Sequence, residues 1–184
     1  MDIKEKMCSG ELYDANNNPQ LIAERNACKA KCQQYNTMPY GCVDERRRIL
    51  DSIIAHKGSV CIVEPPFWCD YGYNIEFGEN FYSNHNLVVL DAAPVSFGDN
   101  VFVAPNCCFT TAGHPLDVEQ RNRGLEYARP ITVGNNVWIG AGVIVLPGVT
   151  IGDNVTIGAG SVVNRDIPSG CVAAGVPCKV IRDL

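Results

Sequence analysis

The sequence has little charge, little leucine and no long apolar run. Charged residues occupy 19% of its 184 positions, against roughly 25% in an average soluble domain. Nine leucines stand against 20 valines and 14 isoleucines. Because β-branched side chains suit strands better than helices, this ratio argues against an all-helical bundle. No apolar run approaches the ~20 residues that cross a bilayer, so we expect no membrane-spanning helix.

Two further absences concern partners and location. The net charge is −5, so the basic face of a nucleic-acid-binding protein is missing, and we expect no nucleic-acid partner. The first residues, MDIKEKMCSGELYDANN, lack the apolar stretch of a signal peptide. We therefore expect a cytoplasmic protein.

Cysteine is abundant, but a metal-binding pattern is missing. None of the ten cysteines forms a C-x2-C pair, and the tightest helical spacing is Cys28-x3-Cys32. Structural zinc sites normally use paired cysteines of that kind, and a secreted disulfide framework needs an oxidising compartment. We therefore expect no metal and interpret most of the cysteines as small buried side chains.

The composition changes near residue 58. Residues 1–58 carry 17 of the 35 charges but only 6 of the 34 valines and isoleucines. This pattern predicts an N-terminal helical region over residues 1–58, with helices at 19–35 and 43–56 and Gly58 as the stop. The aliphatic remainder predicts a second, β-rich domain over residues 59–184.

That second region contains a six-residue repeat. From Val133 to Val163 the first position of every block of six is valine or isoleucine, and glycine follows it in four of the six blocks. The same register appears earlier from Tyr71, and it resumes at Phe97 after a two-residue insertion. Such a period is typical of a solenoid. Three short strands per turn would make 18 residues one coil, with the first residue of each block pointing inward.

Residues 110–129 interrupt the repeat. This segment is polar, with His114 near its start. Insertions in solenoids form loops on one face, which is commonly the functional face. We therefore predict an extruded loop over residues 110–129.

At this point the motifs resemble those of a known family. The segments VEPPFWCDYGYNI, GENFYSNHN, TTAGHPLD, ITVGNNVWIGAGVIVLPGVTIGDN and AAGVPCKVIR resemble the hexapeptide-repeat sugar O-acetyltransferases, in particular the maltose and galactoside acetyltransferases. The resemblance implies an all-β left-handed parallel β-helix, a homotrimer, and acetyl transfer from acetyl-CoA to a hydroxyl of a small sugar.

The resemblance also implies an acceptor site. His114 matches the catalytic base, and Asn84 matches a position beside the acceptor hydroxyl and the tetrahedral intermediate. Asp14 and Asp70 match acceptor-binding positions. Asp70 stands where galactoside acetyltransferases tend to have serine, and Ala92 stands where they have an acidic residue. These two departures favour a maltose- or glucose-type acceptor.

For the donor, the resemblance implies six positions in acetyl-CoA binding: Ala141, Ala159, Asn164, Arg165, Lys179 and Arg182. Ala141 would offer its backbone N–H to the thioester oxygen, and the three cations would meet the phosphates. Glu126 and Asp117 are both candidates to orient the imidazole of His114. Trp138 is a candidate to contact either the pantetheine arm or a neighbouring subunit.

Four alternatives remain open from the sequence. His85 could line the acceptor cleft or simply pack. The acceptor could be an antibiotic or an amino acid. A zinc lyase resembling the γ-type carbonic anhydrases would need three converging histidines, but Glu119 stands where one is required. A non-catalytic scaffold would need neither His114 nor the loop.

Overall fold

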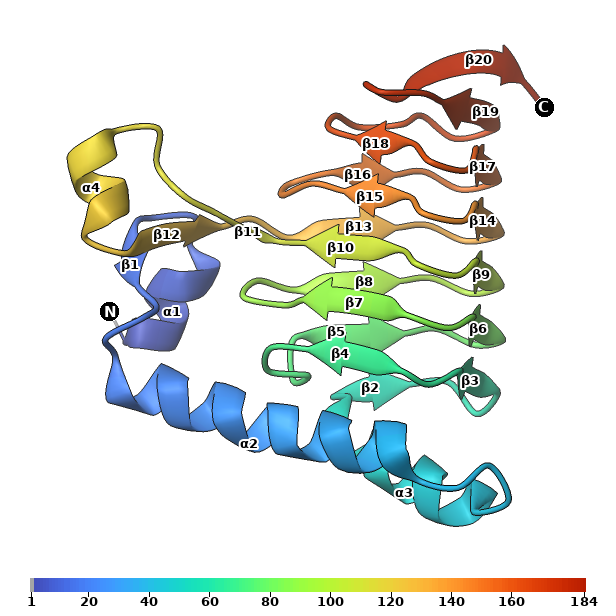
Figure 1. Ribbon diagram of the computed structural model, residues 1–184. Helices are drawn as coiled ribbons and strands as arrows, with labels where there is room; N and C mark the ends of the chain where they lie inside the picture. The colour runs from blue at the N-terminus through green and yellow to red at the C-terminus, as the bar shows by residue number, and fades with distance from the viewer. Residues whose placement is uncertain (1) are drawn as a thin grey trace.

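A computed structural model describes residues 2–184 as a triangular β-solenoid, closed at one end by two helices (Figure 1). Three sheets, each named here by its first strand, form the sides. The β2 sheet contains β2 (His56–Lys57), β5 (Ile75–Phe77), β8 (Val95–Phe97), β13 (Ile131–Val133) and β16 (Thr150–Ile151). The β3 sheet contains β3 (Cys61–Val63), β6 (Phe81–Ser83), β9 (Val101–Val103), β14 (Val137–Ile139), β17 (Val155–Ile157), β19 (Cys171–Ala174) and β20 (Lys179–Asp183). The β4 sheet contains β4 (Phe67–Cys69), β7 (Leu87–Leu90), β10 (Cys108–Thr110), β15 (Ile144–Val145) and β18 (Val162–Val163).

The strand register confirms the repeat. Thr132 pairs in parallel with Thr150, eighteen residues later, and Val133, at the start of a block, is buried. Earlier coils are longer, since Trp68 pairs with Val88, twenty residues later. Apolar first positions stack into one continuous core, which is the physical reason for the valine and isoleucine excess.

The corners explain the recurrent asparagines. Asn80, Asn100, Asn136 and Asn154 all have positive φ, a region that asparagine tolerates better than most residues. Their side chains also form a ladder: Asn100 Nδ2 donates to Asn136 Oδ1 at 3.2 Å, and Asn136 Nδ2 donates to Asn154 Oδ1 at 3.1 Å. These bonds hold consecutive coils in register along one corner.

Two helices close the N-terminal end of the solenoid. Helix α2 (Pro19–Thr37) is capped by the side chain of Asn18, and α3 (Val43–Ile53) follows it; Figure 1 shows both lying across the first coil. The predicted helix at 19–35 is confirmed. The helix predicted at 43–56 ends earlier, and His56 lies in β2, where it pairs with Glu76. Pairing in the sheet supplies backbone partners that a longer helix would have used.

The segment at 110–129 leaves the solenoid and folds onto the N-terminus. It forms β11 (Ala112–Gly113), α4 (Val118–Asn122) and β12 (Leu125–Ala128). Strand β12 pairs antiparallel with both β11 and β1 (Tyr13–Asp14). A small core that includes Met7, from α1 (Ile3–Cys8), packs beneath this sheet. The loop is therefore a structured arm, seen on the left of Figure 1.

Within residues 2–184, no helix combines the length and apolarity that a membrane crossing requires.

Candidate functional site

Several of the predicted site residues fall on two opposite edges of the β4 sheet. Its strands are parallel, so every strand ends at the same edge. Asp70 directly follows β4 at this carboxyl edge, and the arm with His114 leaves the solenoid directly after β10. Asn84, by contrast, precedes β7 at the amino edge. Within one chain, the structure therefore brings His114 and Asp70 to one edge and leaves Asn84 at the other.

His114 is held in a defined orientation by the arm. Its Nδ1 lies 3.0 Å from the carbonyl oxygen of Leu125. Because a carbonyl oxygen only accepts, this contact assigns the proton to Nδ1 and leaves the lone pair on Nε2. The side chain of His114 is 51% exposed, so Nε2 is accessible to a substrate. This arrangement leaves a ring nitrogen that can accept a proton.

Glu126, rather than Asp117, lies next to the imidazole. Glu126 Oε1 is 4.0 Å from Nε2 of His114, whereas Asp117 caps α4 by accepting from the backbone N–H of Gln120. The hydroxyl of Tyr13 donates to Glu126 Oε2 at 3.4 Å. Burial and the neighbouring Glu126 raise the pKa of Tyr13, so its phenol remains a donor. Of the two candidates named from the sequence, Glu126 is therefore the one that lies near His114, while the hydrogen bond to the ring comes from the Leu125 carbonyl.

Asp14 reaches the same region through strand pairing. It lies opposite Leu125 in the β1–β12 ladder, and Leu125 is the residue that binds His114. Asp14 Oδ1 accepts from the backbone N–H groups of Asn16 and Asn17, at 3.2 and 2.9 Å. The Asn17 backbone bond in particular lowers the pKa of Asp14 and keeps this carboxylate charged.

Asp70 is a half-buried carboxylate between two cations. Burial raises its pKa, and Lys29 and Arg25 oppose that effect. The Nζ of Lys29 lies 3.7 Å from Asp70 Oδ1, and Arg25 donates to the hydroxyl of Tyr71 at 2.8 Å. These groups form a polar wall near the arm, where a carboxylate can accept hydroxyl hydrogen bonds.

Sequence reasoning missed Asp91, which shapes that wall. Asp91 follows β7 and is fully buried. Its Oδ1 accepts from the backbone N–H groups of Asp70 (3.0 Å) and Tyr71 (2.8 Å), and Oδ2 accepts from Gly72 (2.7 Å). Burial raises the pKa of Asp91 to about 7, against the stabilising N–H groups of Tyr71 and Gly72. The sequence feature that could have identified Asp91 is the presence of an aspartate within the apolar run LVVLDAA.

The amino edge carries Asn84 and two of the predicted donor positions. Asn84 Oδ1 accepts from the backbone of His85 at 2.7 Å, while its Nδ2 group has no hydrogen-bond partner within residues 2–184. Ala141 and Ala159 are exposed along the same corner, and the Ala141 carbonyl accepts from Gly160. In the described part of the chain, the N–H groups of Ala141 and Ala159 are also unpaired. His85 binds the carbonyl of Pro65 through Nδ1, 2.5 Å away.

The remaining donor positions lie away from the amino edge of the β4 sheet. Asn164 and Arg165 follow β18 at the carboxyl edge, and both are exposed. Lys179 and Arg182 lie on β20, opposite Ala174 and Val172 of β19. Within the described residues 2–184, none of these three cations forms an ion pair, so all three are available for an anionic ligand.

Comparisons with known proteins identify the fold and the chemistry. Residues 6–58 match the maltose acetyltransferase hexapeptide capping motif, and residues 130–165 match the bacterial transferase hexapeptide (six repeats). These repeats imply a left-handed β-helix. The chain is 44% identical to a galactoside O-acetyltransferase of Escherichia coli (strain K12), over 100% of this chain and 90% of the relative.

Solved structures agree with the sequence relatives. A maltose O-acetyltransferase from Clostridium difficile 630 is 48% identical with a TM-score of 0.97, covering 100% of this chain and 98% of the other. A galactoside acetyltransferase in complex with coenzyme A is 44% identical with a TM-score of 0.95, covering 100% and 91%. Likeness of this degree over the whole chain establishes the family.

Proposed function

Because the chain belongs to the maltose/galactoside O-acetyltransferase family of hexapeptide-repeat proteins, we propose that it transfers the acetyl group of acetyl-CoA to a hydroxyl of a small maltose- or glucose-type sugar. The observation that carries this proposal is the contact between His114 Nδ1 and the Leu125 carbonyl, 3.0 Å apart. It leaves the basic nitrogen, Nε2, facing solvent, where an acceptor hydroxyl can approach.

The reaction is a direct attack in a ternary complex. His114 Nε2 takes the proton of the sugar hydroxyl as its oxygen attacks the thioester carbon. The tetrahedral oxyanion receives hydrogen bonds from the Ala141 N–H and the Asn84 amide, which are unpaired donors within residues 2–184. When the intermediate collapses, the carbon–sulfur bond breaks, and the protonated His114 returns its proton to the coenzyme thiolate. Glu126 stabilises the imidazolium in between.

On the acceptor side, Asp14 and Asp70 would bind sugar hydroxyls near His114. On the donor side, Arg165, Lys179 and Arg182 would meet the phosphates of acetyl-CoA. Asp70, in place of the serine typical of galactoside enzymes, supports a glucose-type acceptor, because a carboxylate can accept two hydroxyl hydrogen bonds.

We further propose a homotrimer with sites between subunits. Two outward apolar rows flank the corner that carries Asn84. Ile62, Phe102 and Trp138 are 50%, 43% and 57% exposed on the β3 sheet, and Trp68 and Ile144 are each 39% exposed on the β4 sheet. Packing one such face against the other on a second copy is a heterologous contact, which closes into a ring of three when successive copies are related by a third of a turn. A neighbouring copy could then bring its Asn84 toward the His114 of this one.

The test is mass-spectrometric detection of acetylated product. The protein is incubated with acetyl-CoA and a panel of maltose, glucosides, galactosides, amino sugars, amino acids and aminoglycosides. We expect mono-acetylated maltose or glucoside, and loss of product with His114→Ala. Exclusive acetylation of an antibiotic or amino acid would refute the sugar acceptor, and no turnover with any acceptor would refute the enzymatic proposal.

A further inference from the structure

Three thiols converge beneath the wall that carries Asp70. Cys28 and Cys32 lie one helical turn apart on α2, and Cys69 is the last residue of β4. The Sγ atoms of Cys28 and Cys69 are 3.5 Å apart, and those of Cys32 and Cys69 are 3.7 Å apart. All three sulfur atoms lie within 4.8 Å of one another, and all three residues are buried.

We propose that Cys28, Cys32 and Cys69 form a trithiolate site for a soft d10 metal cation, of which Zn²⁺ is the divalent member that fits best. A zinc–sulfur bond is about 2.3 Å long, so tetrahedral geometry places two bound sulfur atoms roughly 3.8 Å apart. The observed separations of 3.5 and 3.7 Å are close to that value. The protein therefore already holds the ligands near the spacing that binding requires.

The chemistry of the cluster selects the occupant. Three sulfur donors favour thiophilic cations over magnesium or calcium, which prefer oxygen. Three thiolates around Zn²⁺ leave one net negative charge, and around Cu⁺ they leave two. The carboxylate of Asp91 accepts from the backbone N–H groups of Asp70 and Tyr71, directly after Cys69. Its nearby negative charge disfavours a second net negative charge on the cluster, so the divalent ion is the better match.

Metal binding at the cluster depends on pH. The thiolate, not the thiol, is the metal ligand. Binding therefore releases the thiol protons and strengthens as pH rises.

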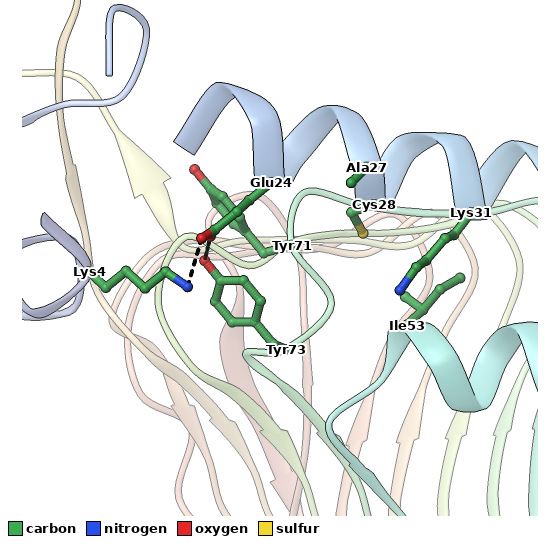
Figure 2. A pocket seen from close by; sticks show the side chains of 8 residues that line it. All are labelled: Lys4, Glu24, Ala27, Cys28, Lys31, Ile53, Tyr71 and Tyr73. Carbon is green, nitrogen blue, oxygen red and sulfur yellow. Dashed lines mark hydrogen bonds and ion pairs between the residues drawn. The ribbon is translucent and has the colours of Figure 1, made fainter. Parts of the chain in front are cut away.

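A cavity gives access to the cluster. It has a volume of about 260 Å³ and lies among Lys4, Glu24, Lys31 and Tyr73, with Cys28 in its lining. Figure 2 shows the Cys28 side chain directed from α2 toward this cavity. The cavity offers an entry path and room for a water molecule as a fourth ligand.

A metal at this site would link α2 to β4, the two elements that hold the proposed acceptor-binding residue Asp70 and its partner Lys29. Cys69 immediately precedes Asp70, and Cys28 and Cys32 belong to the helix that also carries Lys29. A metal bound here would tie α2 to β4 and fix the Asp70–Lys29 pair, 3.7 Å apart. The proposed role is structural, so its test does not depend on catalysis.

Direct metal binding to the intact, reduced protein tests the proposal. Metal-free protein is titrated with Cd²⁺, and thiolate-to-metal ultraviolet absorption is recorded. Zn²⁺ and Cu⁺ are then measured by competition with chromophoric chelators. We expect one ion per chain and an absorption intensity of three thiolates. Cys32→Ser should weaken Zn²⁺ binding by more than ~100-fold, because losing a ligand costs more than losing an outer-shell partner. Cu⁺ binding in place of Zn²⁺ would keep the site and reassign its occupant.

Cys171→Ser is the matched control. Cys171 is also buried, but within residues 2–184 its Sγ forms a hydrogen bond only with the Pro168 carbonyl, at 3.1 Å, which a serine hydroxyl can also reach. Added Zn²⁺ should raise the thermal unfolding midpoint of the wild type and of Cys171→Ser, but not that of Cys32→Ser. The proposal is overturned if reduced wild-type protein binds no stoichiometric metal. Equal affinity in Cys32→Ser, or a Cys28–Cys69 disulfide in freshly isolated protein, would also overturn it.

Discussion

Mixing two inactive variants should restore activity if each site is built from two chains. His114→Ala removes the base, and Asn84→Ala removes an oxyanion donor. Alone, we expect His114→Ala to lower kcat by ~10²–10⁴-fold and Asn84→Ala by ~10²–10³-fold. Co-expressed, the two variants form mixed assemblies in which some sites combine the intact His114 of one chain with the intact Asn84 of another.

The expected recovery of activity rests on how far apart one chain holds His114 and Asn84 at the β4 sheet. Asn84 precedes β7, and Asp91 marks the far edge. The four residues of β7 span roughly 13 Å at ~3.3 Å per residue, whereas a hydrogen bond spans about 3 Å. One chain therefore cannot join its own His114 and Asn84 at one reacting atom. When equal amounts of the two variants assemble at random, the chain that supplies His114 has it intact in about half of the sites, and the same holds for the chain that supplies Asn84. About a quarter of the sites are then complete, so about a quarter of wild-type activity should return.

The assay is coenzyme release or acetyl-sugar formation, with native mass spectrometry to establish that mixed assemblies are present. A double variant carrying both substitutions, co-expressed with wild type, serves as the control for subunit exchange. Verified mixed assemblies that remain as inactive as the separate variants would refute a site shared between chains.

Three further predictions concern single residues. Glu126→Gln should lower kcat about tenfold with an unchanged KM for acetyl-CoA in steady-state kinetics, since Glu126 acts on the imidazolium formed during reaction; an unchanged kcat would contradict this role. Asp91→Asn should cost about 1–3 kcal/mol in urea unfolding, because it places an amide N–H₂ against backbone donors. Since the folded pKa of Asp91, about 7, exceeds its unfolded value of 3.8, its contribution is complete below pH ~4 and is lost as pH rises through 7. The cost of the variant should therefore be larger at pH 5 than at pH 8, and the reverse order would refute the assignment. Trp138→Glu should yield folded monomers by light scattering, because it charges an apolar face; an unchanged mass would exclude this face from the interface.

Much of the fold could be predicted from the sequence because a six-residue repeat within each segment encodes the strands and corners of the solenoid. Val133 and its equivalents point inward because every coil repeats the same strand and corner, so one register predicts all the others. The helix at 19–37 was also locally encoded, by Asn18 and Pro19 at its start. The end of α3 was not, because pairing of His56 with a strand twenty residues away decided it.

The candidate site, too, could be predicted from the sequence only in part. The motif around His114 predicts a general base, but the surroundings of its ring depend on Leu125 and Glu126, which β12 presents after the arm folds back onto β1. The spacing of residues in the sequence could not show that the Asp91 carboxylate accepts hydrogen bonds from the backbone N–H groups of Asp70 and Tyr71. Those groups lie about twenty residues from Asp91 in the chain.

The sequence by itself determined a β-solenoid with an N-terminal helical region and an inserted arm, because inward and corner positions recur every six residues. Its motifs also predict, by resemblance, the residues of an acetyl-transfer site. Only the tertiary structure decided that His114 and Asn84 lie on opposite edges of one sheet. It alone also brought Cys28, Cys32 and Cys69 into one cluster. The sequence did not indicate this cluster, because it contains no C-x2-C pair. The reason is physical: parallel coils bring distant residues together at their edges, and a helix laid across the solenoid adds neighbours that no local period encodes.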